Sequence, residues 1–176
     1  MTNLNCADKD DVVINSHLAN SISLRAVAQS DMPSLQAMYK DSRAKEMAYF
    51  PFTEEQSIQF LDMQFKAQHQ HYQTHYPNAS YDCILLDNEL IGRLYVNRDK
   101  NDIQLIDILL FSSHCNRGIG SYLISQLINE ANDSQRRITA HVEISNPARH
   151  LYQRLGFVET ENQDPYILIV KKPLSS

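Results

Sequence analysis

The sequence predicts a single α/β (α+β) domain, with a mixed, mainly antiparallel twisted sheet of about seven strands and about four flanking helices. The first observation is an apolar run over 105–111 that leads through a polar turn into a helical pattern ending near residue 133. The second is a helix start at Asn146-Pro147, with a glycine stop at Gly156. The third is a series of short alternating segments separated by turn residues, which is typical of antiparallel strands.

The composition is that of an ordinary globular protein and excludes several functional classes. The 176 residues, 43% of them hydrophobic, suffice for one domain with a sizeable core. The net charge of −5 argues against a nucleic-acid partner, since such proteins usually display a basic face. No apolar run is long enough to span a bilayer, so we expect no membrane partner. The acidic, polar N-terminus does not have the pattern of a signal peptide.

The number and spacing of the cysteines indicate the redox state of the compartment in which the protein works. Cys6, Cys83 and Cys115 are widely spaced and odd in number, which favours a reducing compartment over a disulfide framework. We therefore expect a cytoplasmic enzyme. Residues 1–19 are predicted to be an N-terminal extension, partly disordered or docked on a partner surface, that precedes the domain at 20–176.

The first part of the domain predicts one strand and two helices. Residues 21–27 alternate apolar and polar side chains, as a half-buried strand does. A helix begins at Asp31-Met32-Pro33 and runs to about Ser42. Thr53, with Gln56 three residues later, has the spacing of a capping box and begins a second helix that extends to about residue 75.

The rest of the chain predicts six strands and two helices. Residues 81–86 and 90–97 form a hairpin, and Gly92 marks a bulge or a close approach of another backbone. The order strand–helix–strand from 105 to 144 implies a parallel pair. A short helix over 148–155 and two strands, 157–160 and 166–171, complete the order β-α-α-β-β-β-α-β-α-β-β.

A glycine-containing turn before a helix is the strongest functional signal. The chain has four glycines, and Gly118 and Gly120 are two of them. Backbone N–H groups at a helix start attract anions, and glycine lets a phosphate come close. A dinucleotide fingerprint needs a third glycine where Leu123 stands, and a P-loop needs a lysine before Ser121. The alternative to a phosphate-binding loop is a strand-to-helix turn that binds no ligand.

Two motifs resemble those of the GNAT superfamily of N-acetyltransferases, which bind acetyl-coenzyme A. The run Cys115-Asn116-Arg117-Gly118-Ile119-Gly120 resembles the pyrophosphate loop [Gln/Arg]-x-x-Gly-x-[Gly/Ala], with Cys115 in the departing first position. The run Asn146-Pro-Ala…Leu151-Tyr152-x-x-Leu155-Gly156-Phe157 resembles the second signature. The resemblance covers roughly residues 21–172 and includes the predicted order of strands and helices.

The resemblance implies where acetyl-CoA binds. The strands that end near Leu110 and Ile144 are expected to splay apart, with the pantetheine arm along backbone groups and the pyrophosphate at the loop. Arg117 either pairs with phosphate or faces solvent. The residues implied in cofactor binding are Ile108, Leu109, Leu110, Cys115, Asn116, Arg117, Gly118, Ile119, Gly120, Ser121, Asn146 and Tyr152.

The resemblance also suggests catalytic groups. Tyr152 matches a tyrosine that often protonates the leaving thiolate; the alternative is a core tyrosine. The candidates for the base are Asp107, Glu143 and His141. Asp107 interrupts an apolar strand, which suits either a base or a structural acceptor of backbone N–H groups. A position where some members carry a carboxylate is Gln104 here, which cannot accept a proton.

The sequence gives the least information about the site that binds the acceptor. In the family the first helices border the acceptor pocket, so Tyr49, Phe50 and Phe52 either line it or close the core under a loop. The cluster His69, His71 and His75 lacks neighbouring carboxylates or cysteines, and we expect no metal site there.

The predicted reaction is transfer of an acetyl group from acetyl-CoA to a primary amine by direct attack in a ternary complex. The acceptor is either a small amine or a protein or peptide amine. The alternatives are a GNAT-fold CoA-binding regulatory module without turnover, and an acyltransferase that uses a longer acyl-CoA. A homodimer is compatible with the resemblance.

Overall fold

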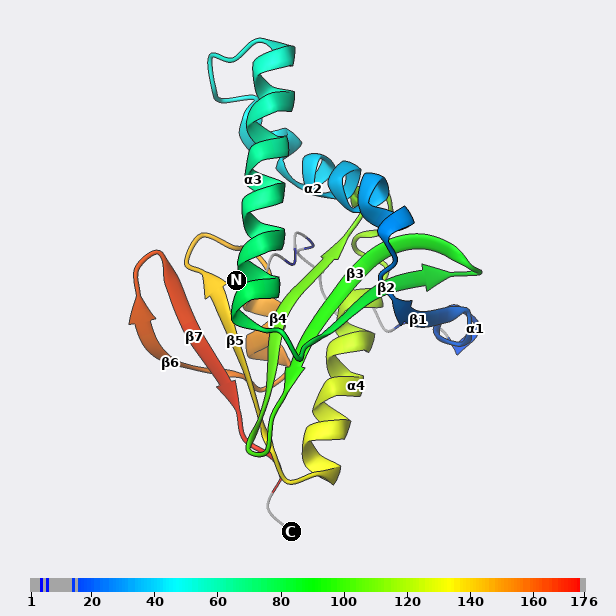
Figure 1. Cartoon of the computed structure of the whole chain (residues 1–176). Helices are drawn as coiled ribbons and strands as arrows, with labels where there is room; N and C mark the ends of the chain where they lie inside the picture. Colours follow the sequence, from blue (N-terminus) through cyan, green and yellow to red (C-terminus); the bar gives the residue numbers. More distant parts are fainter. Residues whose placement is uncertain (1–3, 5, 7–13, 15, 175–176) are drawn as a thin grey trace.

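The computed structural model describes Leu4, Cys6, Ile14 and residues 16–174, and shows one twisted sheet with helices on both faces (Figure 1). The predicted fold class and order are confirmed, with one short helix added before the first strand. The helices are α1 (Ser16–Asn20), α2 (Met32–Met47), α3 (Glu54–His75), α4 (Ile119–Asp133) and α5 (Arg149–Arg154). The strands are β1 (Ile22–Ala26), β2 (Ser80–Leu86), β3 (Glu89–Arg98), β4 (Asp102–Leu110), β5 (Arg137–Glu143), β6 (Val158–Gln163) and β7 (Tyr166–Lys171).

The sheet has the order β1-β2-β3-β4-β5-β7-β6, and β4 and β5 are its parallel pair. Pairing between them covers Asp102–Leu105 of β4 and Arg137–Ala140 of β5. Beyond these residues the two strands separate, as Figure 1 shows, so the predicted divergence is confirmed. The register between β3 and β4 shifts at Ile106, where the divergence begins. An extra residue of this kind bends a strand and increases its twist, which helps to turn β4 away from β5.

The two faces of the sheet carry different helices. On one face α4 and α5 cover a large apolar core that includes Ile108 and Leu110. On the other, α2 and α3 pack over Ile106 and Leu109. In Figure 1 α3 crosses in front of the strands and α4 lies behind them. The site at the divergence of β4 and β5 is therefore bordered by α2 on one side of the sheet and by α4 and α5 on the other.

The N-terminal segment differs from what the sequence predicts. Leu4 and Cys6, placed in an extension expected to be disordered or docked on a partner, are buried in this chain's own core, with 0% and 3% of their surface exposed. Cys6 forms a disulfide with Cys115, so the expectation of unpaired cysteines is wrong for these two. The pair is separated by 109 residues, and no local spacing signals such a contact. Residues 16–19 of the predicted extension form most of α1, Ile14 is also described, and residues 1–3, 5, 7–13 and 15 lie outside the described residues.

Gly92 fulfils both roles predicted for it. The register of β2 against β3 shifts next to its partner Ile84, and the neighbouring β4 comes very close. A Cβ atom at Gly92 would lie 2.7 Å from the carbonyl oxygen of Leu109 and 2.6 Å from Cδ2 of Leu110. Only glycine fits where β3 and β4 approach each other this closely.

Within residues 16–174, no helix combines the length and the apolar character that a bilayer span requires.

Candidate active site

The loop between β4 and α4 has the geometry of an anion site. Gly118 precedes α4 with φ of 77°, and Asn116 also has a positive φ of 59°. The first helical hydrogen bond is donated by the Tyr122 N–H to the Gly118 carbonyl at 2.9 Å. The N–H groups of Ile119 and Gly120 therefore precede the helical ladder and have no acceptor within the helix. They point out of the positive end of a 15-residue helix.

The predicted pantetheine residues lie on the diverging part of β4. Ile108, Leu109 and Leu110 pair with β3 on one side and lie beyond the last pair with β5 on the other. Ile108 and Leu110 pack toward α4, and Leu109 packs toward α2 and α3. The edge of β4 that faces the gap therefore consists of residues whose side chains are packed on one face of the sheet or the other.

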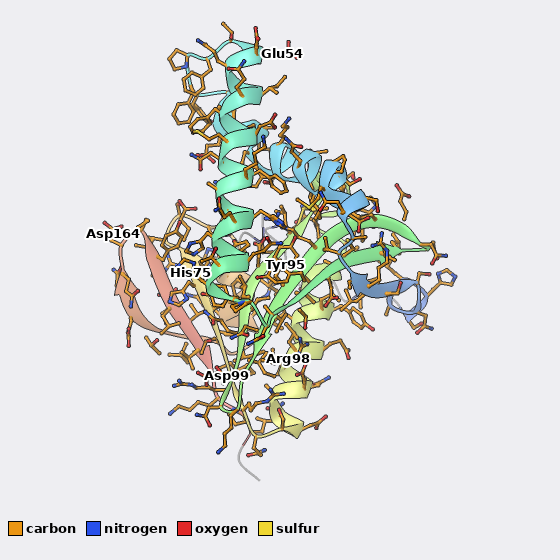
Figure 2. The ribbon with its side chains drawn as sticks, viewed as in Figure 1. Glu54, His75, Tyr95, Arg98, Asp99 and Asp164 are labelled. Carbon is orange, nitrogen blue, oxygen red and sulfur yellow. A yellow bond between two sulfur atoms is a disulfide. The ribbon has the colours of Figure 1, made fainter. Side chains whose placement is uncertain are left out.

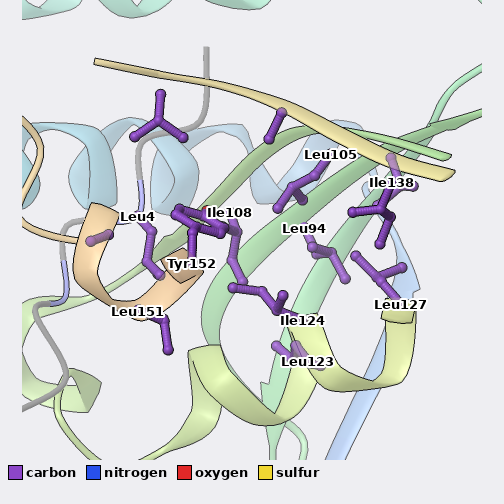
Figure 3. Close-up of a cluster of buried hydrophobic side chains, with 14 of the residues drawn as sticks. Leu4, Leu94, Leu105, Ile108, Leu123, Ile124, Leu127, Ile138, Leu151 and Tyr152 are labelled. Carbon is purple, nitrogen blue, oxygen red and sulfur yellow. The ribbon is translucent and has the colours of Figure 1, made fainter. Parts of the chain in front are cut away.

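Tyr152 reaches the same gap from α5. Its side chain is 1% exposed and packs edge-on against Phe157, with ring centroids 5.5 Å apart. Figure 3 shows its ring beside Ile108 and Leu4. Its hydroxyl has no hydrogen-bond partner among the described residues, which is rare for a buried polar atom. Burial, with a smaller effect of Asp107, raises the pKa of Tyr152 well above its ordinary value of 10.0, so the hydroxyl carries its proton near neutral pH.

An open cavity of about 450 Å³ lies at the end of β5, beside α2. Glu143, half-buried at the end of β5, forms part of its wall together with two charged residues of α2, Arg43 and Glu46. Asn146, a predicted cofactor residue, lines it too, and its Oδ1 accepts a hydrogen bond from the Ala148 N–H at 2.8 Å. The lining consists of Leu4, Ser42, Arg43, Glu46, Glu143, Ser145, Asn146 and Pro147.

The three candidate bases have different surroundings. Asp107 is fully buried, and its Oδ2 lies 2.7 Å from Nε and 2.6 Å from Nη2 of Arg93. Asp107 thus forms a buried ion pair with a side chain, a structural role different from the predicted acceptance of backbone N–H groups. His141 lies on β5 two residues before Glu143 and outside the cavity lining; burial lowers its pKa. Glu143 is the candidate that reaches the cavity.

Gln104 and Arg117 lie in different surroundings. Gln104 donates a hydrogen bond to the hydroxyl of Tyr76 at 3.2 Å, which holds it under the end of α3. Arg117 is exposed and lines a second hollow beside α1, so its guanidinium reaches solvent next to the loop. Both predicted roles of Arg117 remain compatible with this position.

The aromatic loop lies away from these groups. Tyr49 is 89% exposed, and Phe50 and Phe52 stack on each other with ring centroids 5.6 Å apart. Glu54, which follows the loop, lies at the end of α3 that projects beyond the sheet (Figure 2). None of the three aromatic residues is in the lining of the cavity beside Glu143. The structure instead brings Ser42, Arg43 and Glu46 to that cavity, and no sequence signal singled them out.

The three histidines of α3 contact other groups of the same helix. The rings of His71 and His75 lie 4.0 Å apart, and Nδ1 of His75 is 2.9 Å from the His71 carbonyl oxygen. His69 stacks on Phe65. Among the residues that the structure describes, no group of three or more histidine, cysteine or acidic side chains could hold a metal ion.

Comparison with known proteins gives a consistent result. The acetyltransferase (GNAT) family matches residues 35–157 of this chain. A search among curated proteins found no match. Among solved structures, PaiA N-acetyltransferase from Thermoplasma acidophilum, in complex with coenzyme A, is 17% identical, with a TM-score of 0.65 over 86% of this chain and 99% of its own. An acetyltransferase from Thermus thermophilus is 21% identical, with a TM-score of 0.62 over 86% and 97% of the two chains.

A third similar structure is Naa50 of Arabidopsis thaliana, in complex with the bisubstrate analogue CoA-Ac-MVNAL. It is 16% identical and has a TM-score of 0.57 over 86% of this chain and 99% of its own. At these identities the solved structures establish the fold. The family match includes the loop before α4, both diverging strands and Tyr152. It extends over more than half of the sequence, so the chain belongs to the acetyltransferase (GNAT) family and is an acetyltransferase.

Proposed function

We propose that this protein transfers the acetyl group of acetyl-CoA to a primary amine by direct attack in a ternary complex. The observation that carries the proposal is the buried hydroxyl of Tyr152, which lies without a described partner at the point where β4 and β5 separate. A donor in that position has its proton available for a leaving thiolate. The start of α4 supplies backbone donors for the diphosphate, through the N–H groups of Ile119 and Gly120 and the loop residues before them.

The cofactor fits the residues that are present. Two solved structures with the same fold were determined with coenzyme A or a CoA analogue. In this chain Gly118 adopts the left-handed conformation that a sharp turn into a helix needs, and Gly120 has no side chain at the helix start. The acetyl-CoA thioester would supply the electrophilic carbonyl carbon, and the cleft holds the amine nitrogen against it.

Glu143 is the proposed proton acceptor for the amine. An alkylammonium must lose a proton before its nitrogen can attack, and a carboxylate on the cavity wall accepts that proton directly or through water. Glu46 and Glu143 place two negative charges on the wall, against one positive charge from Arg43. This balance favours an acceptor that arrives as an ammonium ion.

The decisive experiment is acetyl transfer by a Tyr152→Phe variant. With the reduced protein and a panel of primary amines, we expect kcat to fall about 100-fold while the Kd for coenzyme A stays within about 3-fold, since only a proton donor is lost. Turnover is followed by chromatographic separation of CoA from acetyl-CoA, which tolerates a reductant. Affinity is measured by calorimetry.

Tyr95→Phe is the matched control. Tyr95 is 1% exposed and its hydroxyl also lacks a partner among the described residues, but it lies on the opposite face of the sheet under α3. Removing this hydroxyl should leave kcat nearly unchanged. Equal kcat values for Tyr152→Phe and the wild type would remove Tyr152 from the reaction. Tight CoA binding without turnover on any amine would favour the regulatory module without turnover.

A further inference from the structure

Leu4, at the N-terminal end of the chain, fills part of the proposed acyl-CoA cleft. Its side chain is 0% exposed and belongs to the same apolar core as Ile108, Ala148 and Tyr152. Figure 3 shows Leu4 beside Tyr152 and Ile108, in the region where β4 and β5 have separated. A residue of the N-terminal segment therefore packs against the groups to which the proposed function assigns the substrate.

The same leucine touches both ends of the proposed site. A Cβ atom at Gly120 would lie 3.4 Å from Cδ1 and 3.5 Å from Cδ2 of Leu4, so the two methyl groups cover the first turn of α4. Leu4 also lines the cavity that contains Glu143 and Asn146. A ligand that runs from the start of α4 to Glu143 would need the volume that Leu4 occupies.

A covalent bond holds this segment in place. Cys6, two residues after Leu4, is 3% exposed and is disulfide-bonded to Cys115, with the two Cα atoms 5.2 Å apart. Cys115 directly precedes the loop at 116–121. A tether this short keeps the leucine at a high effective concentration next to the cleft, whereas an untethered segment would exchange with solvent and with competing ligands.

The third cysteine is unsuited to compete for this bond. Cys83 is 0% exposed, and its thiol donates a hydrogen bond to Oδ2 of Asp31 at 3.5 Å. Burial and the nearby Asp31 raise the pKa of Cys83 to about 11, so it stays a protonated thiol near neutral pH. The chemistry of thiol exchange is thus confined to Cys6 and Cys115.

We propose that Cys6 and Cys115 form a thiol–disulfide switch, in which oxidation locks Leu4 in the cleft as a competitor of acyl-CoA and reduction releases it. The inference rests on the proposed function, because it takes this cleft as the acyl-CoA site. The oxidant is a low-molecular-weight disulfide such as oxidised glutathione. One protein thiolate attacks it and releases a first thiol; the second protein thiolate then attacks the mixed disulfide and releases another.

The atoms balance over these two exchanges. Two protein thiols lose two electrons and two protons and become one S–S bond. The small disulfide gains them and becomes two thiols. A reducing dithiol reverses the reaction, so acetyl transfer would be active in a reducing environment and suppressed in an oxidising one.

The test compares coenzyme A binding by full-length protein treated with oxidised glutathione or with a dithiol, each desalted before calorimetry. Thiol counts in denatured samples verify the two states, with three free thiols expected after reduction and one after oxidation. We expect the oxidised protein to bind coenzyme A at least about 10-fold more weakly, since only the fraction with an open cleft is competent. Cys6→Ser should bind like the reduced protein under both conditions.

Cys83→Ser is the matched control and should keep the full redox response. Leu4→Ala, which leaves both cysteines in place, should recover much of the lost affinity in the oxidised state; circular dichroism checks that it is folded. Equal affinity in the two states, or three thiols after oxidation, would overturn the switch and leave the acyl-CoA site standing. Absence of binding in the reduced wild type and in Cys6→Ser would overturn the proposed function as well.

Discussion

Asp107 on β4 and Glu143 on β5 are carboxylates on the two strands that diverge, yet their surroundings have little in common. Asp107 is 0% exposed, and a single guanidinium, that of Arg93, approaches its Oδ2 with two nitrogens at 2.6 and 2.7 Å. Glu143 is half-buried on the wall of an open cavity. Its neighbour Arg43 is already bound to Glu46 at 2.8 Å.

The difference shows what decides whether a carboxylate can serve as a base. Protonation of Asp107 would leave the buried guanidinium of Arg93 without a counter-charge, which is costly in a dry interior. Burial alone would lower the pKa of Arg93, but Asp107, together with Tyr95 and Tyr72, outweighs it and the pKa is raised. Glu143 forms no such buried ion pair among the described residues and lies on the wall of an open cavity. We therefore expect Asp107 to act on stability and Glu143 on turnover.

The largest effect is expected from Arg93→Met, which leaves the carboxylate of Asp107 buried without its partner. The free energy of unfolding should fall by about 3–5 kcal/mol, as measured by urea denaturation. The double variant R93M/D107L replaces the pair by apolar side chains and should recover most of this loss. Nη2 of Arg93 also donates a hydrogen bond to Oε1 of Gln68 on α3 at 2.7 Å. If the double variant is no more stable than Arg93→Met, the cost lies in the loss of this contact and of the packing against α3 rather than in the unpaired charge.

Glu143→Gln should lower turnover and leave the stability nearly unchanged. It keeps the size of the side chain, so the free energy of unfolding should stay within about 0.5 kcal/mol. The value of kcat/KM should fall about 100-fold, and the acid limb of the pH–rate profile should disappear, because no carboxylate remains to be protonated. Glu46→Gln, on the same wall, is the control and should change kcat/KM less than about 10-fold, because this single charge only attracts the substrate. A retained acid limb in Glu143→Gln would show that another group titrates.

The contrast between the two carboxylates also marks the limit of sequence reasoning. Along a regular strand, Asp107 would share the face of Leu105, which packs toward α4. The register shift at Ile106 turns both Ile106 and Asp107 toward α3, where Arg93 lies. One inserted residue thus moves a side chain to the other face of the sheet, and the alternation of apolar residues does not reveal it.

Local signals, by contrast, were sufficient for most of the fold. The capping box at α3 is present, with the Gln56 N–H donating to Oγ1 of Thr53 at 3.2 Å and the Thr53 N–H donating to Oε1 of Gln56 at 2.9 Å. The turn at Gly118 and the stop at Gly156 also lie where the sequence places them. Contacts between distant residues could not be predicted from such signals. The disulfide bond of Cys6 with Cys115, for example, joins segments that share no periodicity. The cavity residues of α2 were missed for the same reason.

The smallest effect concerns Arg43, the positive charge beside Glu143. Its ion pair with Glu46 is partly exposed, with 29% and 55% of the two side chains accessible, so Arg43→Gln should change the free energy of unfolding by less than about 1 kcal/mol. Loss of the charge removes a repulsion toward an ammonium acceptor, and KM for the amine should fall about 2- to 5-fold at low salt. The shift should shrink as the ionic strength is raised. Lys45→Gln makes the same change of charge on α2 outside the cavity lining and should leave KM unaltered. A rise in KM for Arg43→Gln would indicate that the acceptor presents an anionic group to Arg43, and that the carboxylates of the wall bind a different part of it.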